Sequence, residues 1–273
     1  MAMEKVKKEA PLQKNIDDVI LMDVQRSFTT IKSIKPTALI NILRTYAYYN
    51  PEVEYCQGMN FIVGYLYLLL QDESTVFKFL KNTIEKYKMD QLFTQNVPLL
   101  KNYFYQMDRL LNAHYPHLTT YFRNEGVNAS LFTSAWFITL FTHSLQYAKE
   151  EKPSDMLLAI WDAFLISGWK AIFKTSLFIV GCLEDKLIES RFDQIMIILG
   201  ELPKGEFMRD PETAVKLREK IATLKVTNSM LSSLSAEYLN VTETAKKTYV
   251  SKSGEDSEPS ASTTNEDKNI LHV

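Results

Sequence analysis

The stretch that decides the fold is residues 42–66, ILRTYAYYNPEVEYCQGMNFIVGYL. Its first part continues a pattern that begins at Pro36, in which apolar residues recur at helical spacing. Asn50-Pro51 interrupts this pattern, because proline lacks a backbone N–H and restricts the residue before it. Residues 58–70 are apolar nearly all round, which is typical of a helix buried on every side. The stretch therefore predicts two helices joined by a polar turn.

The segments on either side of this stretch also have helical periodicity. No segment alternates apolar and polar residues as a half-buried strand does, and glycine is scarce, with 8 residues. We therefore predict an all-α fold, a single multi-helix domain of roughly ten helices. One helix is expected to start after a cap at Asp72 or Ser74, and the others are expected over residues 16–28, 98–115, 129–145, 154–168, 170–187, 191–201 and 211–236.

The composition divides the chain into three parts. Residues 1–15 are polar and are expected to form a flexible N-terminus, and residues 16–240 are expected to form the helical domain. From residue 241 the sequence is dominated by Ser, Thr, Glu and Lys, as in SKSGEDSEPSASTTNEDK. Such a segment cannot bury enough apolar surface to offset the entropy of ordering it. Residues 241–273 are therefore expected to be a disordered tail.

Charge and composition exclude several functional classes. The formal net charge of the 273 residues is −2, so there is no overall basic field for nucleic acid or an anionic membrane. Two cysteines, Cys56 and Cys182, are too few for a disulfide framework or a four-cysteine zinc site. The longest apolar run, residues 61–70, is shorter than the roughly 20 residues that cross a bilayer. We expect a cytoplasmic protein with no transmembrane segment and no nucleic-acid partner.

Two short motifs carry the candidate chemistry. In the first, Ile20, Asp23 and Arg26 follow one another at intervals of three, which places them near one face of a helix. Ile20 can hold the segment on the core, and Asp23 can orient Arg26. The second motif, Tyr55-Cys-Gln57-Gly-Met-Asn, lies in the polar turn before the buried helix. A turn supported by a buried helix can hold a functional side chain rigidly.

These motifs resemble a known family. Ile-x-x-Asp-x-x-Arg followed by Tyr-x-Gln is similar to the dual-finger signature of TBC-domain proteins, which are GTPase-activating proteins for Rab GTPases. The stretch quoted above is similar to the family's second motif and its flanks. The later segments SAWFITLFTH and LAIWDAFLISGWKAIFKTSLFIV also resemble family helices. The resemblance covers about residues 16–235.

The resemblance implies a Rab GTPase-activating TBC-like domain that lacks the family's first helices. Arg26 would be an arginine finger that stabilises charge on the transferring phosphoryl group, and Gln57 a glutamine finger that positions the attacking water. Ile20, Asp23 and Tyr55 match supporting positions. The implied partner is a GTP-bound Rab-type GTPase that brings GTP and Mg²⁺, so no cofactor or metal site is expected in the chain. The chain would complete its partner's active site rather than act as a stand-alone enzyme, in vesicle trafficking on endomembranes.

Simpler interpretations of the same residues stay open. Arg26 could be a solvated helix arginine paired with Asp23 or Asp18, and Gln57 a turn residue that satisfies backbone groups. The helical domain could bind a Rab or another partner without accelerating hydrolysis. An unrelated enzyme could use Cys56 as a nucleophile, provided that folding brings His114 or His143 close enough to act as its base.

Overall fold

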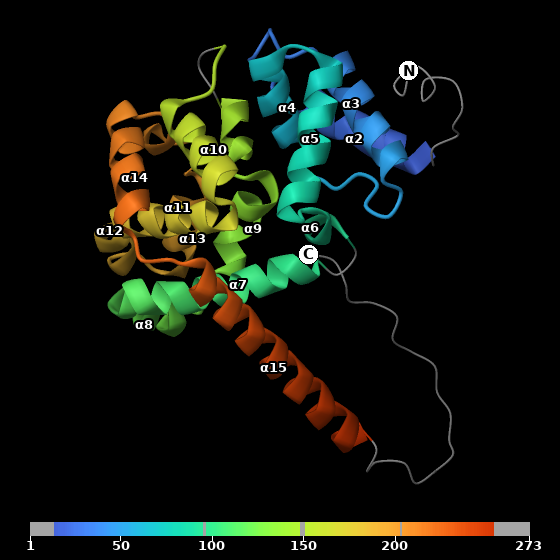
Figure 1. Ribbon diagram of the computed structural model, residues 1–273. Helices are drawn as coiled ribbons and strands as arrows, with labels where there is room; N and C mark the ends of the chain where they lie inside the picture. Colours follow the sequence, from blue (N-terminus) through green and yellow to red (C-terminus); the bar gives the residue numbers. More distant parts are fainter. Residues whose placement is uncertain (1–13, 95–96, 148–150, 203, 254–273) are drawn as a thin grey trace. The chain divides into compact units, whose positions relative to one another are not determined.

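A computed structural model describes residues 14–94, 97–147, 151–202 and 204–253 (Figure 1). Within these ranges the chain contains fourteen α-helices, two 3₁₀ helices and no strand, which confirms the all-α prediction. The elements are α2 (Lys14–Gln25), α3 (Pro36–Tyr49), α4 (Met59–Leu70), α5 (Glu73–Tyr87), α6 (Asp90–Phe93), α7 (Pro98–His114), α8 (Pro116–Asn124), α9 (Ser130–Thr139), η1 (Thr142–Tyr147), α10 (Asp155–Ser167), α11 (Trp169–Cys182), α12 (Glu184–Ile188), α13 (Phe192–Gly200), η2 (Glu206–Met208), α14 (Pro211–Thr223) and α15 (Asn228–Ser253).

Several helix ends follow the local sequence signals. Asp72 accepts a hydrogen bond from the Thr75 N–H at 2.8 Å, and Ser154 accepts one from the Leu157 N–H at 3.2 Å. Both side chains satisfy an amide that the first helical turn leaves without a partner. At the other end of α10, Gly168 has a φ of +64°, a value that favours glycine. The caps predicted at Asp72 and Ser154 and the stop at Gly168 are confirmed.

The predicted helix over residues 129–145 is wrong in its second half. It ends at Thr139, because Leu140 and Phe141 adopt left-handed φ values of 48° and 64°. The Phe141 N–H donates to the Trp136 carbonyl at 3.2 Å, and η1 follows the bend. The Thr142 hydroxyl donates to the Thr139 carbonyl at 2.5 Å, which supports the bend further. The bend turns η1 back toward α4, which it contacts.

Other helix boundaries also differ from the predicted ones. The described residues contain more helices than the predicted ten. Helices such as α6 and α12 have too few residues for a periodic pattern of apolar residues to be recognised in the sequence. Pro116 starts a separate helix, α8. Residues 211–236 divide into α14 and α15, because Thr227 accepts from the Met230 N–H at 3.1 Å and caps a new helix. Helix α2 ends at Gln25, so Arg26 lies in the turn after the helix.

Of the three expected parts of the chain, the structure describes residues 14–15 of the first, most of residues 16–240 and residues 241–253 of the tail. Contacts divide the chain after Ser235 into two compact units, whereas the sequence predicts a boundary after residue 240. Helix α15 continues to Ser253, beyond residue 240, after which the sequence places the tail. This segment contains no glycine or proline before Gly254, and its composition therefore permits a helix. The rest of the predicted tail and residues 1–13 of the predicted flexible N-terminus lie outside the described residues.

In the first unit, α4 is the central helix that positions the candidate site. It packs against α2, α3, α5, α9 and η1. The ring of Phe28, just after α2, occupies the space beside Gly64, where a Cβ would lie 2.2 Å from the ring. Tyr65 on α4 contacts Trp161 of α10, with ring centroids 4.6 Å apart. Glycine at position 64 thus lets the end of α2 lie directly on a helix that is fixed on its other side by α10.

None of the described helices is long and apolar enough to cross a bilayer.

Candidate functional site

Two turns from different parts of the sequence meet at one cleft in the first unit. The turn after α2 contributes Arg26 and Ser27, and the turn before α4 contributes Gln57 and Gly58. Residues of α9 and η1 form the opposite wall, and the cleft has a volume of about 520 Å³. The two motifs predicted from the sequence therefore lie side by side in the folded chain, with Arg26 and Gln57 lining the same cleft.

Asp23 connects the two motifs. Its carboxylate is buried and accepts from Arg26 Nη2 at 2.5 Å and from Tyr55 Oη at 2.6 Å. The side chain of Arg26 is 62% exposed, whereas that of Asp23 is 6% exposed. Burial, and then the hydrogen bond to Asp23, raise the pKa of Tyr55 well above its ordinary value, so Tyr55 keeps the proton that it donates. Asp23 therefore holds a mostly exposed guanidinium at the edge of the cleft.

Gln57 and Ile20 lie in opposite environments. Ile20 is a residue of α2, and its side chain is completely buried in the core, as expected for a residue that holds the segment in place. Gln57 is exposed on the cleft. The next residue, Gly58, has a φ of +110°, and a Cβ there would lie 2.7 Å from Ile138 Cγ2. Glycine is needed for this backbone conformation and for the close approach of the Gln57 turn to α9.

Sequence reasoning missed two polar residues of the site, Ser27 and Asn60. Asn60 Oδ1 accepts from the Gly58 N–H at 3.1 Å, and its Nδ2 donates to Ser27 Oγ at 2.8 Å. The Ser27 hydroxyl in turn donates to the Asp23 carbonyl at 2.6 Å. The available signal was the presence of an amide side chain in an otherwise apolar helical run, because a buried amide must find partners.

The connector after Arg26 is also hydrogen-bonded to a residue that is distant in the sequence. The Glu151 carboxylate, just before α10, accepts from the backbone N–H of Lys32 at 2.8 Å and that of Ser33 at 2.9 Å. It also accepts from the Ser33 hydroxyl at 2.7 Å. These bonds, those from Ser33 first, lower the pKa of Glu151, which stays ionised at neutral pH. The connector is therefore hydrogen-bonded at a point beyond the turn that carries Arg26.

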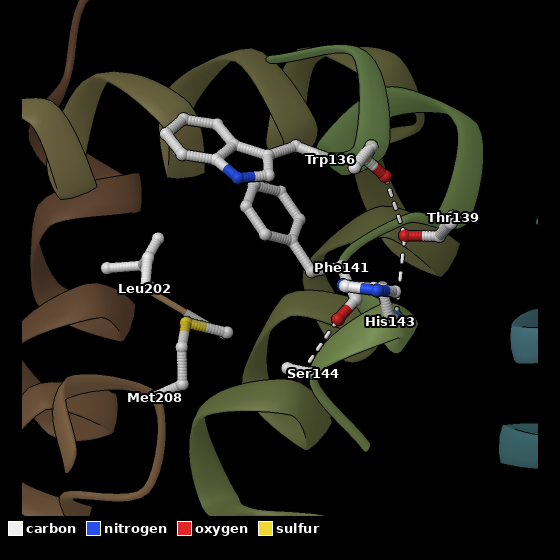
Figure 2. A pocket seen from close by; sticks show the side chains of 8 residues that line it. Trp136, Thr139, Phe141, His143, Ser144, Leu202 and Met208 are labelled. Atoms are coloured by element: carbon white, nitrogen blue, oxygen red, sulfur yellow. Dashed lines mark hydrogen bonds between the residues drawn. The ribbon is translucent and has the colours of Figure 1, made fainter. Parts of the chain in front are cut away.

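The wall opposite the two turns shares Ala135, Thr139 and His143 with a second, smaller pocket, whose lining side chains Figure 2 shows. The Thr139 hydroxyl donates to the Ala135 carbonyl at 2.6 Å, and the His143 N–H donates to Thr139 Oγ1 at 3.4 Å. Burial, and then the nearby Lys204, lower the pKa of His143, which favours its neutral form at pH 7. This second pocket has a volume of about 10 Å³ and is too small for any ligand larger than a water. It is lined by Ala135, Trp136, Thr139, Phe141, His143, Ser144, Leu202 and Met208.

The geometry gives no support to a thiol nucleophile. Cys56 is half-buried and is not among the residues that line the cleft. Burial, and then the charge of Asp23, raise the pKa of the Cys56 thiol, which disfavours the thiolate that acts as a nucleophile. Among the described residues, no group of three or more His, Cys, Asp or Glu side chains is arranged to hold a metal ion.

Comparison with known proteins gives consistent matches. Residues 2–188 match the family model described as the Rab-GTPase-TBC domain. The chain is 31% identical over 201 residues to Growth hormone-regulated TBC protein 1 of Xenopus tropicalis, a match that covers 71% of this chain and 56% of that protein. It is 32% identical over 169 residues to Rab GTPase-activating protein eat-17 of Caenorhabditis elegans, covering 60% of this chain and 18% of that protein. The chain thus spans about half, or less, of the length of these curated relatives.

Two solved structures share the fold. The Ypt/Rab-GAP domain of Gyp1p superimposes with a TM-score of 0.64 at 17% identity, covering 87% of this chain and 78% of that one. The Chlamydomonas flagellar RabGAP TBC domain superimposes with a TM-score of 0.61, also at 17% identity, covering 85% of this chain and 69% of that one. At this level of identity the likeness concerns the arrangement of helices.

Proposed function

The chain belongs to the Rab-GTPase-TBC domain family, and from that premise we propose that it accelerates GTP hydrolysis by a Rab-type GTPase, with Arg26 and Gln57 completing the partner's active site. The observation that carries the proposal is that these two exposed side chains, from separate motifs, line one cleft. The partner binds in its GTP-bound state and brings both GTP and Mg²⁺. The chain supplies side chains and no cofactor.

The role of Arg26 follows from its charge and support. Negative charge shifts toward the leaving and equatorial oxygens as the phosphoryl group is transferred, and a cation in a water-excluded site stabilises it. The guanidinium has five N–H donors, and the bond to Asp23 Oδ1 orients it from one side. Docking of the GTPase brings phosphate oxygens to the exposed side. An arginine supplied in trans contributes about 10³–10⁵ in rate.

Gln57 has a different task, which is to orient water. A glutamine amide can accept from the attacking water through its oxygen and donate to a phosphate oxygen through its nitrogen. In this role Gln57 replaces the glutamine that the GTPase itself would use. The fixed turn at Gly58 limits the freedom of the side chain before docking. Acting where its partner resides on endomembranes, the chain would shorten the GTP-bound state that directs vesicle trafficking.

The test is GTP hydrolysis by a panel of Rab GTPases with and without the chain. At least one Rab should respond to the parent, and Arg26→Ala should lower the stimulated rate by about 10³-fold. Arg44→Ala is the matched control, because Arg44 forms a surface ion pair with Asp17 at 2.8 Å and does not line the cleft. Binding of GTP-loaded Rab without acceleration would replace the proposal with a non-catalytic binding module. If Arg26→Ala and the parent stimulate hydrolysis equally, the catalytic proposal fails.

A further inference from the structure

The start of α4 contains a buried amide that connects both turns of the cleft. Asn60 is 1% exposed, and it lies in the helix sequence MNFIVGYLYLLL. Burying an amide without hydrogen-bond partners is unfavourable, so the partners of Asn60 indicate which parts of the fold depend on it. Those bonds lead in two directions, one to the turn of Gln57 and one to the turn of Arg26.

The oxygen of Asn60 holds the turn of Gln57. Oδ1 accepts from the backbone N–H of Gly58, the residue next to Gln57, at 3.1 Å. Tyr55 Oη, at the start of the same turn, lies 3.3 Å from the same oxygen. Because a backbone N–H can only donate, the oxygen rather than the nitrogen of the amide must face Gly58. The orientation of the amide is thereby fixed.

The nitrogen of Asn60 holds the turn of Arg26. Nδ2 donates to Ser27 Oγ at 2.8 Å, and Ser27 Oγ donates its own proton to the Asp23 carbonyl at 2.6 Å. Ser27 directly follows Arg26 and is 6% exposed. This path acts on the backbone that carries Arg26, whereas the Asp23 carboxylate acts on the guanidinium itself. The two supports are therefore distinct.

We infer that Asn60 is a positioning residue that sets the separation of Arg26 and Gln57 through Ser27 Oγ and the Gly58 N–H. The inference rests on the proposed function and deepens it. Each side chain reaches the reacting phosphoryl group from its own turn, so a relative shift of the two turns misplaces one side chain whenever the other is correctly placed. Misplacement by about 1 Å can cost about 10²-fold in rate. In this role Asn60 acts through the two turns, by its bonds to Ser27 Oγ and to the Gly58 N–H.

The test separates rate from binding in single-turnover hydrolysis by a Rab that responds to the parent. Asn60→Ala should lower the rate at saturating chain by about 10²-fold, while affinity for the Rab loaded with a non-hydrolysable GTP analogue is unchanged. Ser27→Ala should act in the same direction, and the double variant should be no slower than Asn60→Ala, because Asn60→Ala already breaks the bond to Ser27. Asn41→Ala is the matched control, because Asn41 bonds Glu73 at 3.2 Å away from the cleft. A full rate in Asn60→Ala, a proportional loss of affinity, or additive losses would overturn the inference.

A second measurement needs no partner and covers the case in which Asn60→Ala folds poorly. Amide hydrogen exchange in Ser27→Ala should increase in both turns, at residues 26–28 and 55–58, and should not change in Asn41→Ala. Unchanged exchange in the 55–58 turn would show that the turns are independent and would overturn the inference.

Arg26→Ala in the single-turnover hydrolysis assay separates the inference about Asn60 from the proposed function. A normal rate there removes the proposed function, whereas a low rate there with a normal rate in Asn60→Ala removes only the inference about Asn60.

Discussion

At the scale of single residues, the candidate site depends on one buried carboxylate. Asp23 is buried, and its two carboxylate oxygens accept from Arg26 and Tyr55. A buried charge is tolerated only when it is paired and hydrogen-bonded. Both partners therefore support the buried Asp23 carboxylate, and Asp23 in turn orients Arg26. The spacing of Ile20, Asp23 and Arg26 predicted this pair.

Tyr55→Phe tests the support of Asp23 at this scale. The substitution removes one hydroxyl and leaves Asp23 Oδ2 without its 2.6 Å donor. It should lower the free energy of unfolding by about 1.5–3 kcal/mol, the range for a hydrogen bond to a charged group, and it should also lower the stimulated rate. Urea unfolding and single-turnover hydrolysis measure the two effects.

Tyr121→Phe is the control for Tyr55→Phe. The Tyr121 hydroxyl donates to the Ser190 carbonyl at 3.0 Å, a neutral acceptor outside the cleft. Its loss should destabilise the chain by only about 0.5–1.5 kcal/mol and leave the stimulated rate unchanged. Equal losses of activity in the two variants would contradict a specific role for Tyr55.

At the scale of elements, the site consists of two turns placed by the ends of helices. Helix α2 ends at Gln25, and helix α4 begins at Met59 after Gly58. Packing of Phe28 beside Gly64 and of Gly58 beside Ile138 brings these ends to the same cleft. In both places the absence of a side chain allows the close approach. Two glycines thus determine where the two functional turns lie.

Gly58→Ala tests this dependence. The variant places a Cβ 2.7 Å from Ile138 Cγ2 on a backbone with a φ of +110°. Strain of this kind costs about 1–3 kcal/mol, and displacement of the Gln57 turn should lower the stimulated rate as well. The matched control is Gly126→Ala, where φ is +74° and no atom lies within 4 Å of the added Cβ. Thermal unfolding should show the larger destabilisation in Gly58→Ala, and Gly126→Ala should keep full activity. Equal activities in the two variants would argue against a role of the turn.

The sequence predicted long helices and strong caps better than it predicted bends. Apolar periodicity was sufficient for α3, α4 and α10, because each has many core residues and a clear stop. The bend at Leu140 was not predictable, because it depends on left-handed backbone at two apolar residues that local preferences disfavour. The roles expected for Arg26 and Gln57 in the site came from a family resemblance. The role of Asn60 required the fold, because its partners Ser27 and Gly58 belong to different turns.

At the scale of the whole molecule, the core of the first unit contains buried tyrosines that should make its stability sensitive to alkali. Burial raises the pKa of Tyr46 to about 12 and is also the largest cause of the raised pKa values of Tyr55, Tyr65 and Tyr103. An unfolded tyrosine ionises near about pH 10. The folded state therefore binds more protons than the unfolded state above that pH, and stability decreases as pH rises.

The predicted effect has a defined pH window. The contribution of Tyr46 to the free energy of unfolding is fully present below about pH 10 and is lost as pH rises through the folded pKa of about 12. The urea midpoint should therefore fall across this window. Tyr46→Phe should make the fall shallower, because phenylalanine has no proton to lose. A midpoint that does not change with pH over this window in the parent chain would contradict the prediction.

The central claim, that Arg26 and Gln57 complete a Rab active site, is tested most directly with a GTPase that lacks its own catalytic glutamine. The measurement is single-turnover GTP hydrolysis by such a Rab variant in the presence of the parent chain, Arg26→Ala or Gln57→Ala. The parent chain should still accelerate hydrolysis, and each substitution should abolish the acceleration. Loss of acceleration with the parent, or full acceleration with Gln57→Ala, would contradict it.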